Sequence, residues 1–303
     1  MKRHALRTLL SLAILIFFVI HASKFHQWEF ITALERQAYD ARLEITMPQT
    51  PDPRIVIVDL DEKSLSEIGR WPWNRSIMAH LIKQLFDKYK IDVLGMDVVF
   101  AEPDESSGLK KLQQLAQGPL ADTPAFLERL TELRPMLDYD ALFAQSLRDR
   151  RVVLGYVFTS AQHGMENIEA GALPLPTVLA EEARKIYGFK SFMGKGYAAN
   201  LPQFQANAIA AGHFNSVPDP DGIVRSVPML YGYKNDLYES LSLAVTRVAL
   251  GAPHVELGLN INQGYPKLEN LFIQDHQIPI DKKLRAYVPY RGEQGSFPYV
   301  SAT

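Results

Sequence analysis

An almost unbroken apolar run stands near the start of the chain, from Thr8 to Ile20. Counted from Ala5 to Ala22, the stretch is just long enough for a helix across a bilayer core, which needs roughly 17–25 residues. No second apolar run of comparable length follows it. The pattern therefore predicts a single transmembrane helix.

The charges beside this run give it an orientation. Three basic residues precede it, so the positive-inside rule keeps the first residues in the cytoplasm and exports the rest. They are Lys2, Arg3 and Arg7. A cleaved signal peptide is the alternative, but Ile20 two positions before Ala22 makes a poor small-residue cleavage signature. We expect residues 1–24 to form a cytoplasmic start and an uncleaved anchor, with residues 25–303 extracytoplasmic.

A helical period continues beyond the apolar run. Between Trp28 and Leu43, apolar residues recur at three- and four-residue steps among charged ones. This predicts an amphipathic stalk helix that runs directly on from the membrane segment, with Trp28 and Phe25 at the interface. A helix packed on its own domain is the alternative. Prolines end the helix, so residues 25–53 are predicted to be a stalk and a Pro-rich connector.

Unalternating apolar runs then predict buried strands. Such runs cover residues 54–59 and 91–100, with a helical period over 76–89 between them. Strand, helix and strand in this order predict a right-handed βαβ unit with two adjacent parallel strands. A third strand is expected at 151–158. We expect an α/β fold with a mainly parallel sheet flanked by helices.

The remaining sequence is expected to elaborate this sheet. Residues 54–303 form one exported domain in this interpretation, in which 103–150 are a helical insertion and 160–206 an irregular excursion. Asp219–Gly222 is a strong turn signal. Further elements are expected as a short helix at 177–186, a strand at 223–231, a helix at 241–250 and short strands at 271–273, 277–280 and 285–290.

Composition excludes several classes of protein. The net charge is −2, which gives no basic footprint for nucleic acid. There are no cysteines, so the exported part must be stable through its core alone. The eight histidines show no pair at metal-ligand spacing, and we expect no cofactor in this chain.

Acidic residues gather where the first two predicted strands end. They are Asp59, Asp61, Asp97, Glu102 and Asp104. The carboxyl ends of parallel strands face one crevice, so these carboxylates could bind a divalent cation or perform acid–base chemistry. Arg70 and Arg75 lie in the loop across the same edge and could instead neutralise them in a structural network. The local supply of arginines favours the structural network, and the metal remains unassigned.

The segment Val56–Asp61 also resembles the opening of haloacid-dehalogenase-type phosphatases, a buried strand ending in Asp-x-Asp. In that family the first Asp is the nucleophile and the second the general acid. Here Glu62 stands where the family has a glycine, and no later Asp-Asp pair completes a magnesium site. An exported Asp-dependent hydrolase is therefore kept only as an alternative.

Trp71-Pro72-Trp73 is the most unusual tripeptide of the chain. Two indoles around a proline form a stiff aromatic ridge that could stack on a ligand. Because tryptophan is usually mostly buried, a cap on the core is the favoured interpretation.

Six spaced motifs stand out along the exported part of the chain. They are 54–65 (RIVIVDLDEKSL), 69–75 (GRWPWNR), 97–104 (DVVFAEPD), 212–215 (GHFN), 219–225 (DPDGIVR) and 288–292 (VPYRG). Together they resemble the second type of CHASE domain, the cyclase/histidine-kinase-associated sensory extracellular domain of bacterial receptors. The resemblance covers roughly residues 28–303.

The resemblance implies a sensor in the bacterial inner membrane that passes a signal to a cytoplasmic output domain, most often a class III adenylate/guanylate cyclase. The expected partners are the membrane, a second copy in a homodimer and an unidentified small molecule or ion. The chain holds only anchor and sensor and resembles a fragment, so we expect no catalytic residue in it. A ligand-free scaffold or dimerisation module is the other alternative. From the matching motifs Asn215, Asp221 and Arg225 join the carboxylates, arginines and tryptophans as candidates for the signal crevice.

Overall fold

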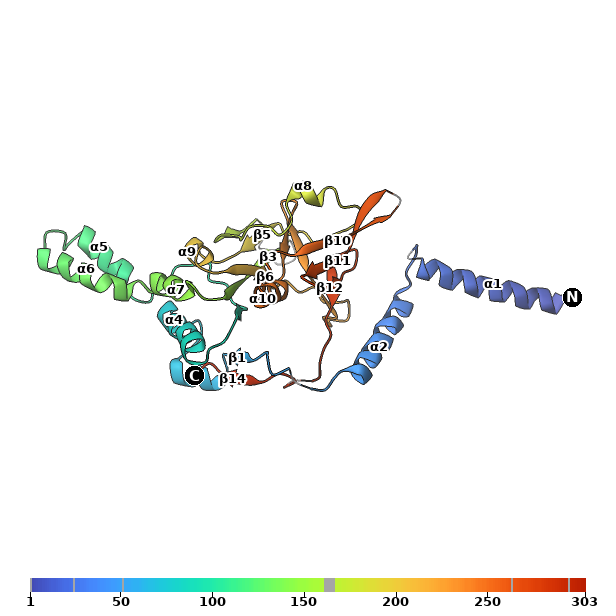
Figure 1. Ribbon diagram of the computed structural model, residues 1–303, viewed down its shortest axis with the longest axis horizontal. Helices are drawn as coiled ribbons and strands as arrows, with labels where there is room; N and C mark the ends of the chain where they lie inside the picture. The colour runs from blue at the N-terminus through green and yellow to red at the C-terminus, as the bar shows by residue number, and fades with distance from the viewer. Residues whose placement is uncertain (1, 24, 51, 161–166, 263, 294) are drawn as a thin grey trace. The chain divides into compact units, whose positions relative to one another are not determined.

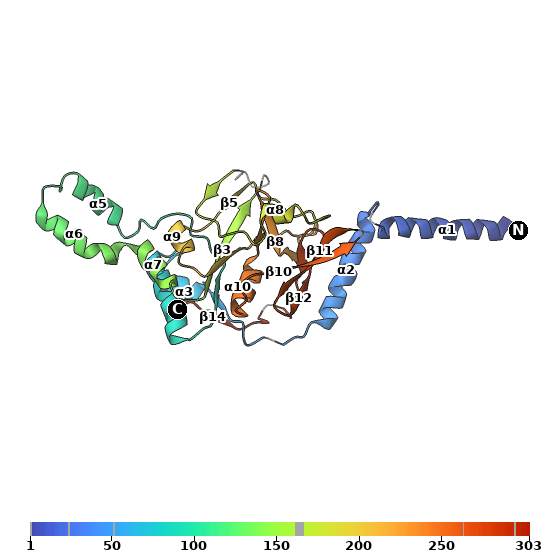
Figure 2. The same cartoon turned by 45° about the horizontal axis from the view of Figure 1, so that its top comes forward.

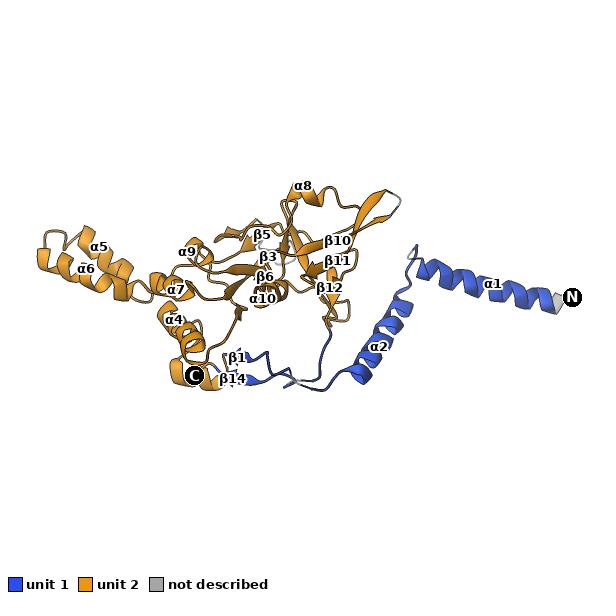
Figure 3. Cartoon of the chain, viewed as in Figure 1, with its two compact units in different colours: residues 1–59, 289–301 blue, residues 60–288, 302–303 orange. Residues whose placement is uncertain are grey.

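The computed structural model describes residues 2–23, 25–50, 52–160, 167–262, 264–293 and 295–303. The chain divides into two compact units, each considered by itself (Figure 3). The first comprises residues 1–59 and 289–301, and the second comprises residues 60–288 and 302–303.

The first unit begins with two helices, α1 (Lys2–Ala22) and α2 (Glu29–Thr46) (Figure 1). Within the described residues, α1 is the one helix long and apolar enough to cross a membrane. The expected continuous helix from membrane to stalk is wrong, because the chain leaves the helical conformation between Ala22 and Glu29. The indole of Trp28 stacks on Phe17 with ring centroids 3.9 Å apart, and the Trp28 N–H donates to His21 Nδ1 over 3.1 Å. These contacts fix an extended Trp28 at the start of α2, where a continuous helix would need helical backbone angles.

A short parallel ladder completes the first unit. β1 (Ile57–Asp59) pairs with β14 (Tyr299–Ser301), with Ile57 opposite Tyr299 and Asp59 opposite Ser301. The predicted βαβ unit is therefore wrong: the first strand pairs with a C-terminal strand that the sequence pattern did not reveal. Only three residues of the apolar run 54–59 form a strand, so the ladder between β1 and β14 is short.

The centre of the second unit is a five-stranded sheet in the order β2–β3–β5–β4, with β6 also paired to β3. β3 (Val152–Thr159) runs parallel to β2 (Leu94–Met96) and β6 (Ala210–His213) and antiparallel to β5 (Gly196–Ala198). β4 (Glu169–Ala170) lies parallel to β5. The sheet is thus mixed, and a mainly parallel sheet is not confirmed.

Helices cover both faces of this sheet (Figure 2). The side chains of β3 alternate, so Leu154 and Tyr156 face a core that α4 (Arg75–Lys83) and α7 (Tyr139–Leu147) help to build. Val153 faces α10 (Leu241–Ala249) on the opposite side. Helices were expected to flank the sheet, and they do so on both sides of β3, whose eight residues are nearly all buried.

Small antiparallel sheets make up the rest of the second unit, around a second core that includes Leu230, Leu271 and Leu284. The expected strand 223–231 is divided between two ladders, since Pro228 ends the first of them. The ladders are the hairpin β8 (Leu230–Tyr233) and β9 (Asp236–Glu239), the pair β7 (Ser226–Pro228) and β13 (Arg285–Tyr287), and the sheet β10 (Glu256–Asn262), β11 (Tyr265–Ile273) and β12 (His276–Pro279).

The two less regular stretches differ in character. Residues 103–150 are helical, with α5 (Leu109–Gln117) packed on α6 (Pro124–Leu137) ahead of α7. In residues 160–206 the described part, 160 and 167–206, carries only short elements. Residues 161–166 lie outside the described residues. The remaining helices are α3 (Glu62–Ile68), a π-helical turn (Gln84–Lys88) that prolongs α4, α8 (Ala180–Ala183) and α9 (Pro202–Gln205).

Candidate functional site

Arg75 lies at the centre of the largest group of predicted site residues. It is the first residue of α4, whose N-cap Asn74 accepts a hydrogen bond from Ile77 N–H. The backbone N–H of Arg75 donates to Asp104 Oδ2 over 2.6 Å, where a carboxylate also complements the helix dipole. Its guanidinium lies 4.3 Å above the ring of Phe100. The cluster therefore joins the start of α4 to the segment that follows β2.

A second carboxylate, Asp140 on α7, completes this cluster. Asp140 Oδ2 accepts from the backbone N–H of Asp104, and Asp140 Oδ1 lies 3.9 Å from Arg75 Nε. Both of these last atoms are buried and have no hydrogen-bond partner among the described residues. The separation is too long for a hydrogen bond, so Arg75 and Asp140 are held as neighbours by charge and packing.

Burial and hydrogen bonds set the titration of the three groups in different directions. Burial lowers the pKa of Arg75, although Asp140 and Asp104 oppose this. Burial also raises the pKa of Asp140 more than its hydrogen bond from Asp104 and the charge of Arg75 lower it. Burial would raise the pKa of Asp104 too, but hydrogen bonds from Ser106 and from the Arg75 backbone outweigh it and leave that pKa lowered. Asp104 is the firmer anion of the pair.

The other predicted acidic residues do not join this cluster through their carboxylates. Glu102 is exposed and contributes only its backbone oxygen, to Arg75 over 3.3 Å. Asp97 is also exposed. Asp61 is the N-cap of α3 and accepts from Ser64 N–H over 2.8 Å. Asp59 belongs to the first compact unit, where it ends β1 with an exposed side chain.

The tryptophan ridge has one buried and one exposed ring. Trp73 is 3% exposed, packs in the main core and donates from Nε1 to Gly69 O over 2.8 Å. Trp71 meets it edge-on with centroids 5.9 Å apart and is 37% exposed. Arg70 beside it is exposed. The ridge thus offers one indole, Trp71, to the surface.

Asn215 acts as a clamp on the end of β3. Its Oδ1 accepts from Phe158 N–H over 2.8 Å, and its Nδ2 donates to Phe158 O over 2.7 Å. The amide thus satisfies both backbone groups of one residue, as a neighbouring strand would.

Arg225 and Asp221 form a separate charged group with Asp219. Arg225 Nη1 donates to Asp219 over 3.0 Å and to Asp221 over 2.9 Å, while Nη2 lies 2.9 Å from the other oxygen of Asp221. The Arg225 side chain is only 5% exposed. The turn at 219–222 is closed by Gly222 N–H donating to Asp219 O, so this group fastens the predicted turn to the body of the unit.

Sequence reasoning missed three residues of these networks. Asp140 lies in a helical stretch with no strand end to mark it. Asn200, whose Oδ1 accepts a hydrogen bond from the N–H of Phe100 beneath Arg75, lies in the irregular excursion. Asp219 belongs to the turn motif and could have been found there, because an arginine six residues later is within reach of a turned chain.

The described residues contain no group of three or more His, Cys, Asp or Glu side chains that could hold a metal ion. Two shallow pockets, of about 320 Å³ and 270 Å³, are lined by none of the predicted site residues. Chemically, the arrangement around Arg75 is a partly buried ion-pair network in which Arg75 Nε retains a donor and Asp140 Oδ1 an acceptor that no described residue uses.

The family model described as the CHASE2 domain matches residues 11–303. No curated protein and no solved structure matches the chain.

Proposed function

Because the chain belongs to the CHASE2 domain family, a family of extracellular sensory domains of signalling receptors, we propose that it is the sensor portion of a bacterial membrane receptor. The observation that carries this proposal is the extent of the match, from within α1 to the last residue. We infer that residues 25–303 lie outside the cytoplasm and that the signal passes to an output domain outside this chain.

The helix α1 supports a membrane location for the sensor. It could span a membrane by length and composition, and nearly all of its described residues are exposed in the isolated chain. Exposed Leu, Ile and Phe side chains on a free helix would be costly in water, and a bilayer removes that cost. A single-pass anchor within this chain is the arrangement proposed.

A class III adenylate/guanylate cyclase is the proposed output, since such enzymes most often accompany this kind of sensor. Their active sites form across two subunits, so the proposal includes a homodimer. The sensor then alters the output only to the extent that the signal binds the two receptor states with different affinities.

We propose that the signal acts on the Arg75 cluster. Three charges meet there under partial burial, and Arg75 Nε and Asp140 Oδ1 hydrogen-bond to none of the described residues. A small molecule or ion that pairs with either group would change the balance between α4 and α7, on which the two side chains stand. Asp61, by contrast, is engaged as a helix cap, which gives the hydrolase alternative no free general acid.

Topology is the first test. The chain has no cysteine, so a single introduced thiol reports its own location. Gln114→Cys, on the exposed surface of α5, should react with a membrane-impermeant maleimide in intact spheroplasts, whereas His4→Cys should react only after lysis. Reaction of both only after lysis would place the domain in the cytoplasm and overturn the sensor proposal.

Coupling is the second test, made on the full-length receptor in its membranes. Asp140→Asn removes one charge of the cluster and should change the cyclic nucleotide output, while Glu102→Gln removes an exposed carboxylate nearby and should not. Equal output from both variants and the parent, at equal receptor levels, would remove the Arg75 cluster from signalling.

A further inference from the structure

Exposed cations and exposed aromatic and aliphatic side chains occur together on three segments of the second unit, and none of them is a predicted site residue. The apolar side chains are strongly exposed, and Ile261 reaches 74%. We call this set of residues the basic–apolar patch. The apolar members are Tyr187, Leu259, Ile261 and Tyr265, and the cations are Arg184, Lys185, Lys190, Lys282 and Lys283.

Backbone hydrogen bonds place the segments that carry these residues side by side. Tyr187 N–H donates to Pro266 O over 2.7 Å, which ties the segment after α8 to the β10–β11 hairpin. The rings of Tyr187 and Tyr265 lie 5.1 Å apart. On the other side, Lys190 N–H donates to Lys282 O over 2.7 Å. The segment 184–190 therefore runs between the apolar hairpin and the lysine pair.

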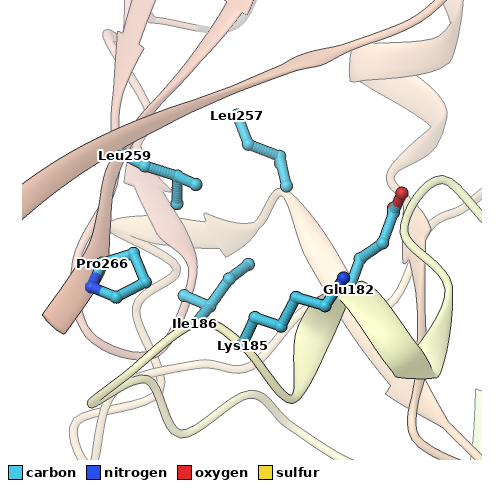
Figure 4. Close-up of a pocket in the computed structure, with 6 residues that line it drawn as sticks. All are labelled: Glu182, Lys185, Ile186, Leu257, Leu259 and Pro266. Carbon is cyan, nitrogen blue, oxygen red and sulfur yellow. The ribbon is translucent and has the colours of Figure 1, made fainter.

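The apolar part of the patch continues into a shallow hollow. A pocket of about 270 Å³ opens between α8 and the hairpin, and its lining is mostly apolar. Figure 4 shows Ile186 facing Leu257, Leu259 and Pro266, with Glu182 and Lys185 at its edge. Exposed Ile, Leu and Tyr side chains next to such a hollow are costly in water, so the surface is suited to an apolar partner.

The charge of the patch indicates which partner. None of the five cations forms an ion pair with a described residue, and Lys283 Nζ lies 5.8 Å from the centroid of the Phe192 ring. Asp281 and Glu269 on the same segments are held by Arg285 and Lys267, so the exposed acids beside the five cations are Glu181 and Glu182 of α8. Unpaired lysine and arginine around exposed tyrosine and isoleucine are the combination that anionic lipid surfaces bind, headgroups meeting the cations and rings lying at the interface.

We propose that this patch docks on the surface of the bilayer that α1 crosses, where it binds anionic lipid headgroups. The anchor supplies a second, independent reason for this occupant. A domain tethered to a membrane by its own chain meets that surface at a high effective concentration, so weak contacts suffice. The inference rests on α1 being membrane-embedded, as does the proposed function, but it adds a second point of contact.

The test uses the full chain in lipid nanodiscs. Ile261→Cys, which is unique in this cysteine-free chain, carries an environment-sensitive fluorophore, and the discs contain nitroxide-bearing lipid as the quencher. Discs of phosphatidylcholine are compared with discs that contain phosphatidylglycerol. We expect quenching in the anionic discs, weaker quenching in the neutral discs, and relief by salt because the attraction is screened.

Matched variants separate the patch from the anchor. Lys282→Glu with Lys283→Glu should lower the docked population about tenfold or more in anionic discs, since each cation at such a surface contributes measurably. Lys110→Glu with Lys111→Glu makes the same change on α5 and should leave quenching unaltered. A label at Gln114 on α5 should not be quenched in any disc.

Each other outcome counts against the proposal. Failure of the chain to co-elute with nanodiscs would show that the anchor, and with it the proposed function, is wrong. Co-elution without quenching at residue 261, or quenching indifferent to lipid charge, would refute the docking alone. Fluorophore-to-fluorophore contact that requires two copies per disc would assign the patch to a protein interface instead.

Discussion

Asn200 Oδ1 accepts a hydrogen bond over 2.9 Å from the backbone N–H of Phe100, one hundred residues earlier in the chain. Its Nδ2 donates to Gly155 O over 2.9 Å, so one buried amide joins the segment after β2 to the middle of β3. The last paired residues of β2 and β3 are Met96 and Leu154. The side chain thus takes over the bridging where the two strands separate.

Replacing Asn200 should therefore cost more than its size suggests. Asn200→Ala leaves two buried backbone groups without partners, each costing about 1–3 kcal/mol, so we expect a loss of roughly 2–4 kcal/mol in the free energy of unfolding. Urea unfolding followed by circular dichroism measures it. Asn207→Ala is the matched control, because Asn207 is half-buried and bonds to Arg148 and to Gln203 O. Equal losses in the two variants would contradict the bridging role.

Arg75 gives a second contrast, with Arg70 five residues earlier. Arg75→Ala uncovers Phe100 and leaves Asp104 and Asp140 close together under partial burial without their cation, so we expect a loss of about 2–3 kcal/mol. Arg70 is exposed, and Arg70→Ala should change stability by less than about 0.5 kcal/mol. Thermal unfolding of the two variants in parallel decides the matter, and a stable Arg75→Ala protein would show that the cluster holds nothing together.

His213 should make stability depend on pH. Burial lowers its pKa from 6.5 to about 3, and both ring nitrogens lack partners among the described residues. Below about pH 6.5 the imidazole of His213 is protonated in the unfolded chain but stays neutral in the folded chain. The free energy of unfolding therefore falls as the pH drops below that value. At pH 5 the loss attributable to His213 should be about 2 kcal/mol.

The measurement is a series of urea midpoints between pH 7 and pH 5. His213→Gln should flatten the fall, whereas His276→Gln, at an exposed position on β12, should follow the parent. Parallel curves for the parent and both variants would show that His213 takes up its proton without unfolding the protein.

The interruption between α1 and α2 bears on how the stalk could transmit a signal. One residue inserted after Arg36 rotates the remainder of α2 by about 100°, and we expect the output of the full-length receptor to change. One residue inserted after His26 falls in the non-helical link and should be absorbed there. An output indifferent to both insertions would exclude rotation of α2 as the signal.

The sequence pattern predicted the elements of this fold better than their partners. The apolar run at 151–158, the helical period over 76–89 and the turn signal at 219–222 depend on local chemistry. They are present as β3, as α4 with its π-helical extension, and as a closed turn. Strand pairing depends on distant residues: β14 carries no long apolar run, so nothing near Ile57 indicated its partner. The mixed sheet was likewise hidden, since β5 lies in a stretch of weak periodicity.

The candidate site shows the same division. Arg75 and Asp104 do meet. The sequence indicated this, because Asp104 follows the second predicted strand and Arg75 lies in the loop expected to cross the end of that strand. Asp140 joins them only through the packing of α7 on α4, a tertiary contact without local signature. Asp59 and Asp61, two residues apart in one motif, belong to different compact units, which no spacing argument could have shown.

The parallel pairing of β1 with β14 has a mechanical consequence. Residue 57 begins one strand and residue 301 ends the other, so these points lie at opposite ends of the ladder. Tension that pulls the chain before β1 away from the chain after β14 loads every rung at once, in shear, instead of peeling the rungs apart one by one. A ladder of three residue pairs loaded in shear resists a steady force and then separates in one step, because its hydrogen bonds must break together.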